Sequence, residues 1–453
     1  MKGARRTPED SDGGLGPAVD RCASLLASSA AVRWEVFAKA SLTRQTDFVD
    51  GRLRRTASIE EGGLAVRFFD GRHAGFAAAS GLGESSARTA VDAARVGAAR
   101  SNDPMPPQRL LGTTPVPPGP AMPAQGWAQH ITSELEIALA TMSDGGLRLG
   151  RAIVQEGSYR WKLTTVDDWS ADHERMVASI LVEVLVDDRP GTWREWIHIA
   201  DPRTFDAASL AARIGNRALL TRHRITTDQG LHDLILHPEV SAQLLAGISP
   251  LFLAHHDGAD PLPALLDTNG LLSAYALTVV DDRSDPTAPV VGPCDGEGLP
   301  ARRTLLLDEG APRHRVASFA DARRFDEVPR GGAVRFSYRD RPTTGFANLR
   351  VLTQDGVPAG ELLAATDRAL YLLRPLAPVV CDLDRDAYSL IASGVWLDRQ
   401  RVRGWHPVVE LSGGLGALLR RIDAVGTDVS WFQTPRGFVG APTLLVRRQP
   451  VVG

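Results

Sequence analysis

The chain has 453 residues, of which 43% are hydrophobic and 23% charged, and its formal net charge is −3. This is the composition of an ordinary globular protein, and the weak charge provides no overall field that would attract nucleic acid. Cys22, Cys294 and Cys381 are scattered and form no CxxC pair, so we expect a reducing, cytoplasmic setting. No apolar run of about 18 residues occurs, and we therefore expect neither a signal peptide nor a membrane-spanning helix.

The first half of the chain alternates between helical and strand patterns. Residues 1–17 are polar and glycine-rich, which predicts a disordered tail. Asp70-Gly71 lies between two apolar runs and predicts a hairpin with a type I′ turn. Residues 101–123 are rich in proline and fit either a surface crossover loop, which we favour, or an interdomain linker. Periodicity predicts helices over 19–30, 84–100, 127–142 and 207–221, and strands over 32–38, 64–69, 74–78, 151–186 and 193–199.

A second unit is expected to start near Gly230. A short buried strand leads to a helix whose first position is Pro238 and whose end is set by Pro250. From Leu272 onward, short apolar runs separated by glycine, aspartate and proline predict mostly β structure. The strongest strand patterns are 369–373, 393–396, 408–411 and 443–446.

The most informative stretch is residues 294–310, CDGEGLPARRTLLLDEG. It resembles the signature D-x-E-G-[apolar]-x-x-R-R, followed by an apolar strand and a glycine turn, of the TldD/TldE (PmbA) family of peptide-processing metallopeptidases. Asp295 and Glu297 could act as a carboxylate pair, but we expect a structural role, with Asp295 capping the turn and Gly296 and Gly298 adopting positive φ. The residues that carry the match are Asp295, Glu297, Gly298, Arg302, Arg303 and Gly310.

The resemblance extends beyond the signature. The stretch EEGGLAVRFFDGRHAGFAAAS is similar to a strand–turn–strand segment of the family's first domain. Near the C-terminus, residues 386–389, 411–414 and 422–428 are similar to turns and a helix end in the last segment of the family. Three features depart from the family pattern. Gly414 stands where asparagine is usual, Asp398-Arg399-Gln400 replaces a Glu-Asn-Gly turn, and the spacing of prolines over 101–123 is unusual.

The resemblance implies an α+β fold with two domains after the tail. The first, residues 18–225, would be an α/β domain, and the second, residues 226–453, would be mostly β and barrel-like. Members of the family pair as a heterodimer: TldD carries zinc through a helical His-Glu-x-x-x-His motif and a later cysteine, whereas TldE lacks these ligands.

The zinc motif is missing from this sequence. The helix expected to present it spans the window 240–253, VSAQLLAGISPLFL, which contains neither histidine nor glutamate. Residues 434–440, where the cysteine ligand would fall, contain no cysteine. The single His-Glu pair, His173-Glu174, has no second histidine at the required spacing, and we expect His173 to be solvated. We therefore assign no catalytic or metal-ligating residue to this chain.

One other cluster remains as a candidate. His255, His256 and Asp257 follow the helix that would carry zinc in a relative, and they could lie near substrate or simply end the helix. Adjacent helical residues point about 100° apart, so the two imidazoles are poorly placed to share one metal. We list the three as substrate-proximal candidates.

The sequence therefore predicts a catalytically silent, TldE-like subunit of a heterodimeric zinc metallopeptidase. Zinc is expected in a TldD-like partner with the HExxxH motif, and the substrate would be an unfolded or modified peptide. The departures from the family pattern suggest a copy dedicated to natural-product maturation. The alternatives are a non-enzymatic peptide-binding or scaffold protein and a lone hydrolase with a relocated site.

Overall fold

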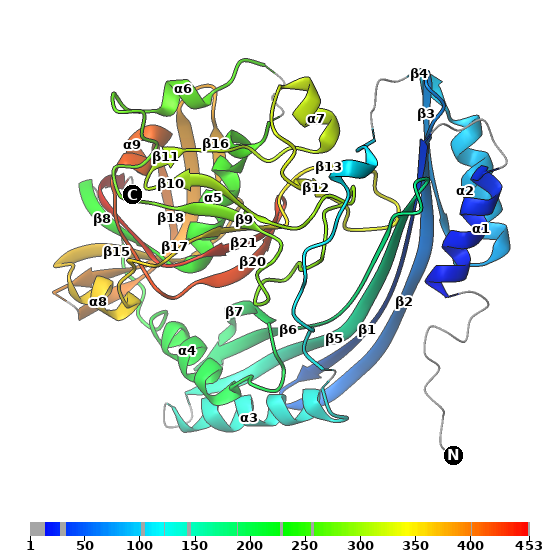
Figure 1. Cartoon of the computed structure of the whole chain (residues 1–453). Helices are drawn as coiled ribbons and strands as arrows, with labels where there is room; N and C mark the ends of the chain where they lie inside the picture. The colour runs from blue at the N-terminus through cyan, green and yellow to red at the C-terminus, as the bar shows by residue number, and fades with distance from the viewer. Residues whose placement is uncertain are drawn as a thin grey trace.

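The computed structural model describes residues 14–27, 33–100, 105–121, 123–142, 146–187, 189–226, 230–254, 258–399 and 401–451. Figure 1 shows a long, strongly curved sheet from the first half of the chain that partly embraces a second body built by the other half. The predicted α+β fold class is confirmed. Most of the predicted tail lies outside the described residues, and helix α1 (Leu15–Ala27) already begins within the stretch expected to be disordered.

The N-terminal sheet is a seven-stranded antiparallel sheet in the order β4-β3-β2-β1-β5-β6-β7. Its central strands are far longer than the sequence predicted, because polar residues continue the alternation on the solvated parts of both faces. The strands are β1 (Arg33–Val49), β2 (Arg52–Phe69), β3 (His73–Ser80), β4 (Ala99–Arg100), β5 (Leu147–Thr165), β6 (Ser170–Val186) and β7 (Arg189–Ile199).

The predicted hairpin at Asp70-Gly71 exists, but its turn is not type I′. Only Gly71 has a positive φ, of 102°, and the Asp70 carboxylate instead accepts hydrogen bonds from the backbone N–H groups of Arg72 and His73. The paired positive φ angles typical of a type I′ turn occur one hairpin earlier, at Asp50 (48°) and Gly51 (68°).

Four helices cover the convex face of this sheet: α1, α2 (Glu84–Val96), α3 (Trp127–Thr141) and α4 (Ala207–Leu219) (Figure 1). Helix α2 stops at Gly97, short of the predicted end, and the residues that follow form β4. Because these helices lie on the convex face, the concave face is left to meet the second half of the chain.

No helix among the described residues is long and apolar enough to cross a membrane.

The C-terminal half contains two larger sheets. One has the order β11-β10-β9-β14-β21-β20, and the other runs β16-β17-β15-β8-β22-β19 with β18 beside β17. The strands are β8 (Gly230–Leu236), β9 (Val279–Asp282), β10 (Arg303–Asp308), β11 (Ala311–Pro312), β12 (Ala333–Val334), β13 (Thr343–Thr344), β14 (Asn348–Val351), β15 (Arg368–Pro375), β16 (Val380–Asp382), β17 (Ala387–Asp398), β18 (Arg401–Gly414), β19 (Ile422–Val425), β20 (Ser430–Thr434), β21 (Gly437–Ala441) and β22 (Leu444–Val451).

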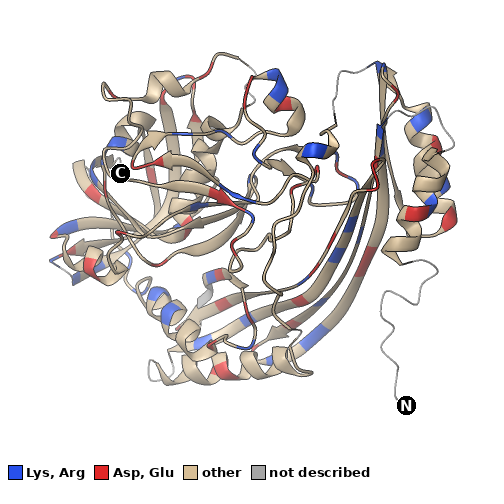
Figure 2. Cartoon of the chain, viewed as in Figure 1, with Lys and Arg blue, Asp and Glu red and all other residues tan. Residues whose placement is uncertain are grey.

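Helix α5 (Pro238–Ile248) lies in the core between these two sheets, where its apolar side chains join a single buried cluster with residues of both. The shorter helices are η2 (Gln108–Leu110), η3 (Ser249–Phe252), α6 (Leu262–Leu265), α7 (Phe319–Arg324), α8 (Ala359–Ala364) and α9 (Leu415–Arg420). Figure 2 shows acidic and basic residues interspersed over both halves of the chain, in keeping with the small net charge.

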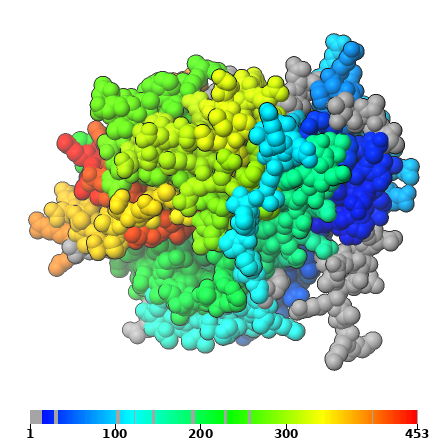
Figure 3. Space-filling view, in the orientation of Figure 1, coloured from blue at the N-terminus to red at the C-terminus, as the bar shows by residue number. Residues whose placement is uncertain are grey.

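The proline-rich segment 105–121 is an ordered crossover. The backbone N–H of Gly112 donates to the Gly298 carbonyl at 3.0 Å, and that of Thr114 donates to Pro293 at 2.7 Å. Figure 3 shows this segment, in cyan, lying on the surface across the boundary between the two halves of the chain. These two hydrogen bonds hold the segment against the loop that carries the signature.

Candidate binding cavity and signature turn

The acidic turn of the signature is closed by the carboxylate of Asp295. One oxygen accepts hydrogen bonds from the N–H groups of Glu297 (2.8 Å) and Leu299 (2.9 Å), and the other accepts from Ala333 (3.0 Å). Burial raises the pKa of Asp295, while nearby Arg283 and these three donors oppose the rise. Because both oxygens already have partners, the geometry gives Asp295 a capping role in the turn.

The glycines of the signature serve different needs. Gly298 and Gly310 have φ angles of +88° and +84°, which only glycine adopts without strain. The expected positive φ at Gly296 is wrong: a Cβ there would instead lie 3.1 Å from the Arg335 side chain and 3.2 Å from the Ala333 carbonyl oxygen. Close packing, and not backbone handedness, therefore favours glycine at position 296.

Glu297 joins a buried ionic network that links the two halves of the chain. Its Oε1 lies 3.3 Å from Arg67 Nη1 on β2, and its Oε2 accepts from the N–H of Phe319 at 2.7 Å. Arg67 Nε also lies 3.6 Å from Glu35 on β1, and Glu35 in turn pairs with Arg335. All four charged side chains are at most 4% exposed.

The two carboxylates of this network titrate differently. Burial raises the pKa of Glu297 to about 7, although Arg67 opposes the rise. Burial would also raise the pKa of Glu35, but the guanidinium groups of Arg335 and Arg67 together hold it below its usual value. Glu297 is therefore the member whose charge depends on pH near neutrality.

The two signature arginines point to different surroundings. Both are exposed, but Arg303 also pairs with Asp282 on the neighbouring strand β9, with its Nε 2.7 Å from the carboxylate. Neither lines the cavity described below. The structure therefore brings Asp295 and Glu297 into one buried turn and leaves the arginines to the strand that follows.

Helix α5 is the element on which the family resemblance places zinc ligands, and its residues do not fit the metal. Of its eleven residues eight are buried, and the one polar residue among them bonds locally, because Ser241 Oγ donates to the Leu236 carbonyl. In η3, Ser249 Oγ likewise donates to Ala246. The described residues contain no group of three histidine, cysteine, aspartate or glutamate side chains placed to hold a metal ion.

A polar group does gather where α5 begins. His237 caps the helix, its Nδ1 accepting from the N–H of Glu239 at 3.2 Å, and burial beside Arg217 and Arg213 keeps its pKa well below 6.5. Burial together with the nearby Glu195 carboxylate raises the pKa of Glu239 from 4.5 to about 7. The sequence patterns did not indicate this cluster, because its charged members come from three separate elements.

The raised pKa of Glu239 makes stability depend on pH. Because the folded-state pKa exceeds the unfolded one, the carboxyl contributes stability below about pH 4.5 that is lost as the pH rises through about 7. We expect Glu239→Gln to reduce the decline in unfolding free energy between pH 4.5 and 8 by about 2 kcal/mol, measured by urea denaturation across that range. A variant curve parallel to that of the parent would contradict this assignment.

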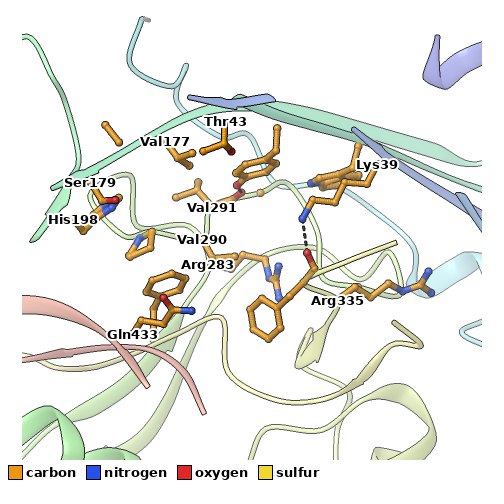
Figure 4. A pocket seen from close by; sticks show the side chains of 18 of the residues that line it. Lys39, Thr43, Val177, Ser179, His198, Arg283, Val290, Val291, Arg335 and Gln433 are labelled. Carbon is orange, nitrogen blue, oxygen red and sulfur yellow. Dashed lines mark hydrogen bonds between the residues drawn. The ribbon is translucent and has the colours of Figure 1, made fainter. Parts of the chain in front are cut away.

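A cavity of about 350 Å³ lies between the concave face of the N-terminal sheet and the signature loop. Strands β1 and β5 contribute neighbouring residues of one face, because Phe37 pairs with Leu163 and Lys39 with Trp161 in the antiparallel register. The aromatic residues on its walls are Phe37, Tyr159, Trp161, Trp196, Phe336 and Phe438. Figure 4 shows side chains from both halves of the chain converging on this space.

The cavity has cationic groups on opposite walls. Lys39 reaches in from the sheet, where its Nζ donates to the Phe336 carbonyl and lies 5.3 Å from the centre of the Tyr159 ring. Arg283 enters from the loop after β9 (Figure 4), and its guanidinium donates to the Ala333 carbonyl at 3.0 Å. Burial lowers the pKa of Lys39, while the charges of Glu61 and Asp340 oppose the decrease.

Two histidines on this face were not predicted as site residues. His173 is half-buried, with its ring centre 5.9 Å from that of Trp161, so the expectation of a solvated side chain is wrong. His198 lines the cavity, and burial followed by the charge of Arg175 lowers its pKa to about 4. The sequence signal that could have found both is the alternation of β6 and β7, which places them on the concave face.

The remaining candidates can be placed briefly. His255, His256 and Asp257 lie outside the described residues. Cys294 lines the cavity and Cys381 packs against α5, and burial raises the pKa of both thiols, that of Cys381 to about 12. Neither thiol is therefore activated as a nucleophile.

A curved antiparallel sheet with helices on its convex face, joined through a buried acidic turn to a two-sheet C-terminal body, defines the class of two-part α+β proteins to which this chain belongs. Family models match residues 229–453, as the PmbA/TldA metallopeptidase C-terminal domain, and residues 34–98, as PmbA/TldA metallopeptidase domain 1. Together these matches cover more than half of the chain. The chain is a member of the PmbA/TldD family.

Solved structures share the whole fold at low sequence identity. TldE from Thermococcus kodakarensis has a TM-score of 0.80 and 12% identity over 96% of this chain and 100% of its own. A putative modulator of DNA gyrase from Thermotoga maritima has a TM-score of 0.77 and 15% identity over 97% and 100%. Another from Bacteroides thetaiotaomicron has a TM-score of 0.74 and 13% identity over 97% and 98%. A search of curated proteins found no match.

Proposed function

We propose that the chain is a catalytically silent subunit of a heterodimeric TldD/TldE-type zinc metallopeptidase. The observation that carries the proposal is the character of α5, whose side chains pack as an apolar core where a zinc-binding subunit would need imidazoles and a carboxylate. The zinc would belong to a TldD-like partner with the HExxxH motif, and this chain would shape the peptide-binding chamber. We place the complex in the cytoplasm, with a modified peptide, such as a natural-product precursor, as its substrate.

An open sheet edge supports a role in binding other chains. Strand β2 pairs with β3 only from Gly63 onward, so among the described residues its stretch 52–61 has a neighbour on one side alone. This stretch is exposed and includes Leu53 and Ile59, which are 56% and 57% exposed. Such an edge can accept an added strand from a peptide or a partner.

Co-expression with a family member that carries HExxxH tests the proposal. We expect a stable one-to-one complex with one zinc per heterodimer and an interface above about 2,000 Å². The chain alone should bind no stoichiometric zinc. It should also self-associate through the face that the partner would otherwise cover. Metal analysis and light scattering of the chain with and without its partner measure both expectations. Zinc bound to the purified single chain with chelator-sensitive peptide hydrolysis would overturn the proposal and favour a lone hydrolase.

The cavity favours a second candidate function, a peptide-binding or scaffold protein with no peptidase role. Its aromatic walls and cationic groups lie within this one chain and need no partner to form them. A monomer that binds peptide and has no affinity for any TldD-type chain would favour this candidate over the heterodimer.

A further inference from the structure

We propose that the cavity between the concave sheet face and the signature loop binds a carboxylate attached to an aromatic or large apolar group, as at the C-terminus of a peptide that ends in such a residue. That the carboxylate belongs to a peptide rests on the proposed function. That the cavity binds a carboxylate is independent of the proposed function, because every group involved lies in this chain and is present without a partner.

The size and walls of the cavity select the body of the ligand. A volume of about 350 Å³ lies at the lower end of pockets that enclose small organic molecules. Trp196 and Phe438 stack at 6.3 Å across the two halves of the chain, and Phe37 and Trp161 pack at 6.1 Å on the sheet. These rings offer edge and face contacts to an aromatic ligand, so an apolar or aromatic side chain is favoured over a charged one.

The charges select the head group. Lys39 and Arg283 bring positive charge into the cavity, whereas the cationic Arg335 is neutralised by Glu35. The two carboxylates among the described lining residues, Asp295 and Glu156, already have partners. Both oxygens of Asp295 accept backbone hydrogen bonds, and Glu156 pairs with Arg44, 3.4 Å away on the neighbouring strand.

Three polar atoms of the lining residues have no hydrogen-bond partner in the described part of the chain. These are Arg283 Nε, Arg335 Nε and His198 Nε2, all buried. An unpartnered buried polar atom costs free energy that a ligand oxygen can recover, and a carboxylate supplies two such oxygens. A cationic cavity with spare donors and aromatic walls therefore fits an aromatic carboxylate better than it fits a neutral or cationic ligand.

Calorimetric titration of the full-length chain tests the proposal with two matched probes. N-acetylphenylalanine should bind, and N-acetylphenylalaninamide, which lacks the charge, should bind roughly tenfold more weakly or worse. Lys39→Met should remove most of that difference in affinity, because it should weaken the binding of N-acetylphenylalanine and leave that of the amide unchanged. Lys39→Arg should retain the difference. Equal affinities for the two probes, or no binding of either, would overturn the proposal.

A neighbouring lysine provides the control. Lys162 pairs with Ala38, one position from the Lys39–Trp161 pair, so its side chain lies on the opposite face of the same sheet. Lys162→Met should therefore leave both affinities unchanged, and an equal effect of the two substitutions would refute a role for the cavity.

Two further ligands distinguish the source of the carboxylate. Tighter binding of a tripeptide that ends in phenylalanine than of 3-phenylpropionate assigns a peptide terminus, and equal binding assigns a free aromatic acid. A failure of the chain to form a complex with a TldD-type partner would refute the proposed function and leave these titrations unaffected.

Discussion

Arg67→Met is expected to lower the free energy of unfolding by about 3–5 kcal/mol at pH 8. The substitution keeps most of the side-chain volume but leaves Glu297 without its guanidinium partner and weakens the field around Glu35. Both carboxylates are only 1–2% exposed, so water cannot replace the lost charge. Urea denaturation followed by tryptophan fluorescence measures the loss.

The pH dependence of this loss separates charge from packing. The pKa of Glu297 is already raised to about 7, and removal of Arg67 raises it further, so acidification protonates the orphaned carboxyl. The cost of Arg67→Met should therefore be smaller at pH 5.5 than at pH 8. Arg44→Met breaks a pair in which the arginine is 50% exposed, and it should cost less than about 1 kcal/mol. Equal costs for the two variants would contradict the proposed network.

Only part of this ionic network could be predicted from the sequence. A capping role for Asp295 could be predicted because its hydrogen-bond donors at Glu297 and Leu299 follow it within four residues. The partner of Glu297 could not be predicted, since Arg67 lies 230 positions earlier and nothing local marks it. Pairing between the two halves of the chain depends on how their sheets meet, and the periodicity of the sequence carries no information about that.

The same limit applies to the cavity. The alternation of residues 32–38 predicted a strand but placed Lys39 beyond its end, because the polar residues that follow hid the continuation to Val49. Once the strands pair, the register fixes that Lys39 and Trp161 share a face. The residues that close the space, among them Arg283 and Phe438, come from the other half of the chain. Family membership was accessible from short motifs, whereas the site required the assembled sheets.

Gly310→Ala is expected to destabilise the protein by about 2–5 kcal/mol. Glu309 and Gly310 form the two-residue turn between β10 and β11, with φ angles of +49° and +84°. A Cβ on Gly310 would lie 2.2 Å from the carbonyl oxygen of Ser273, which is backbone and cannot rotate away. The N–H of Gly310 also donates to the Leu277 carbonyl at 2.9 Å, so relief of the clash would break this contact. The midpoint and slope of urea denaturation measure the effect.

Gly270→Ala separates the two causes of this loss. Gly270 has a similar φ of +76°, but a Cβ there would meet no atom within 4 Å. The control should therefore cost only the backbone strain, about 1–2 kcal/mol. The additional loss of unfolding free energy in Gly310→Ala, beyond that in Gly270→Ala, measures the close approach of the signature turn to the loop at Ser273. If both variants lost the same stability, the glycine that ends the signature would be required for its φ angle alone, and the packing of this turn against the preceding loop would contribute nothing to the fold.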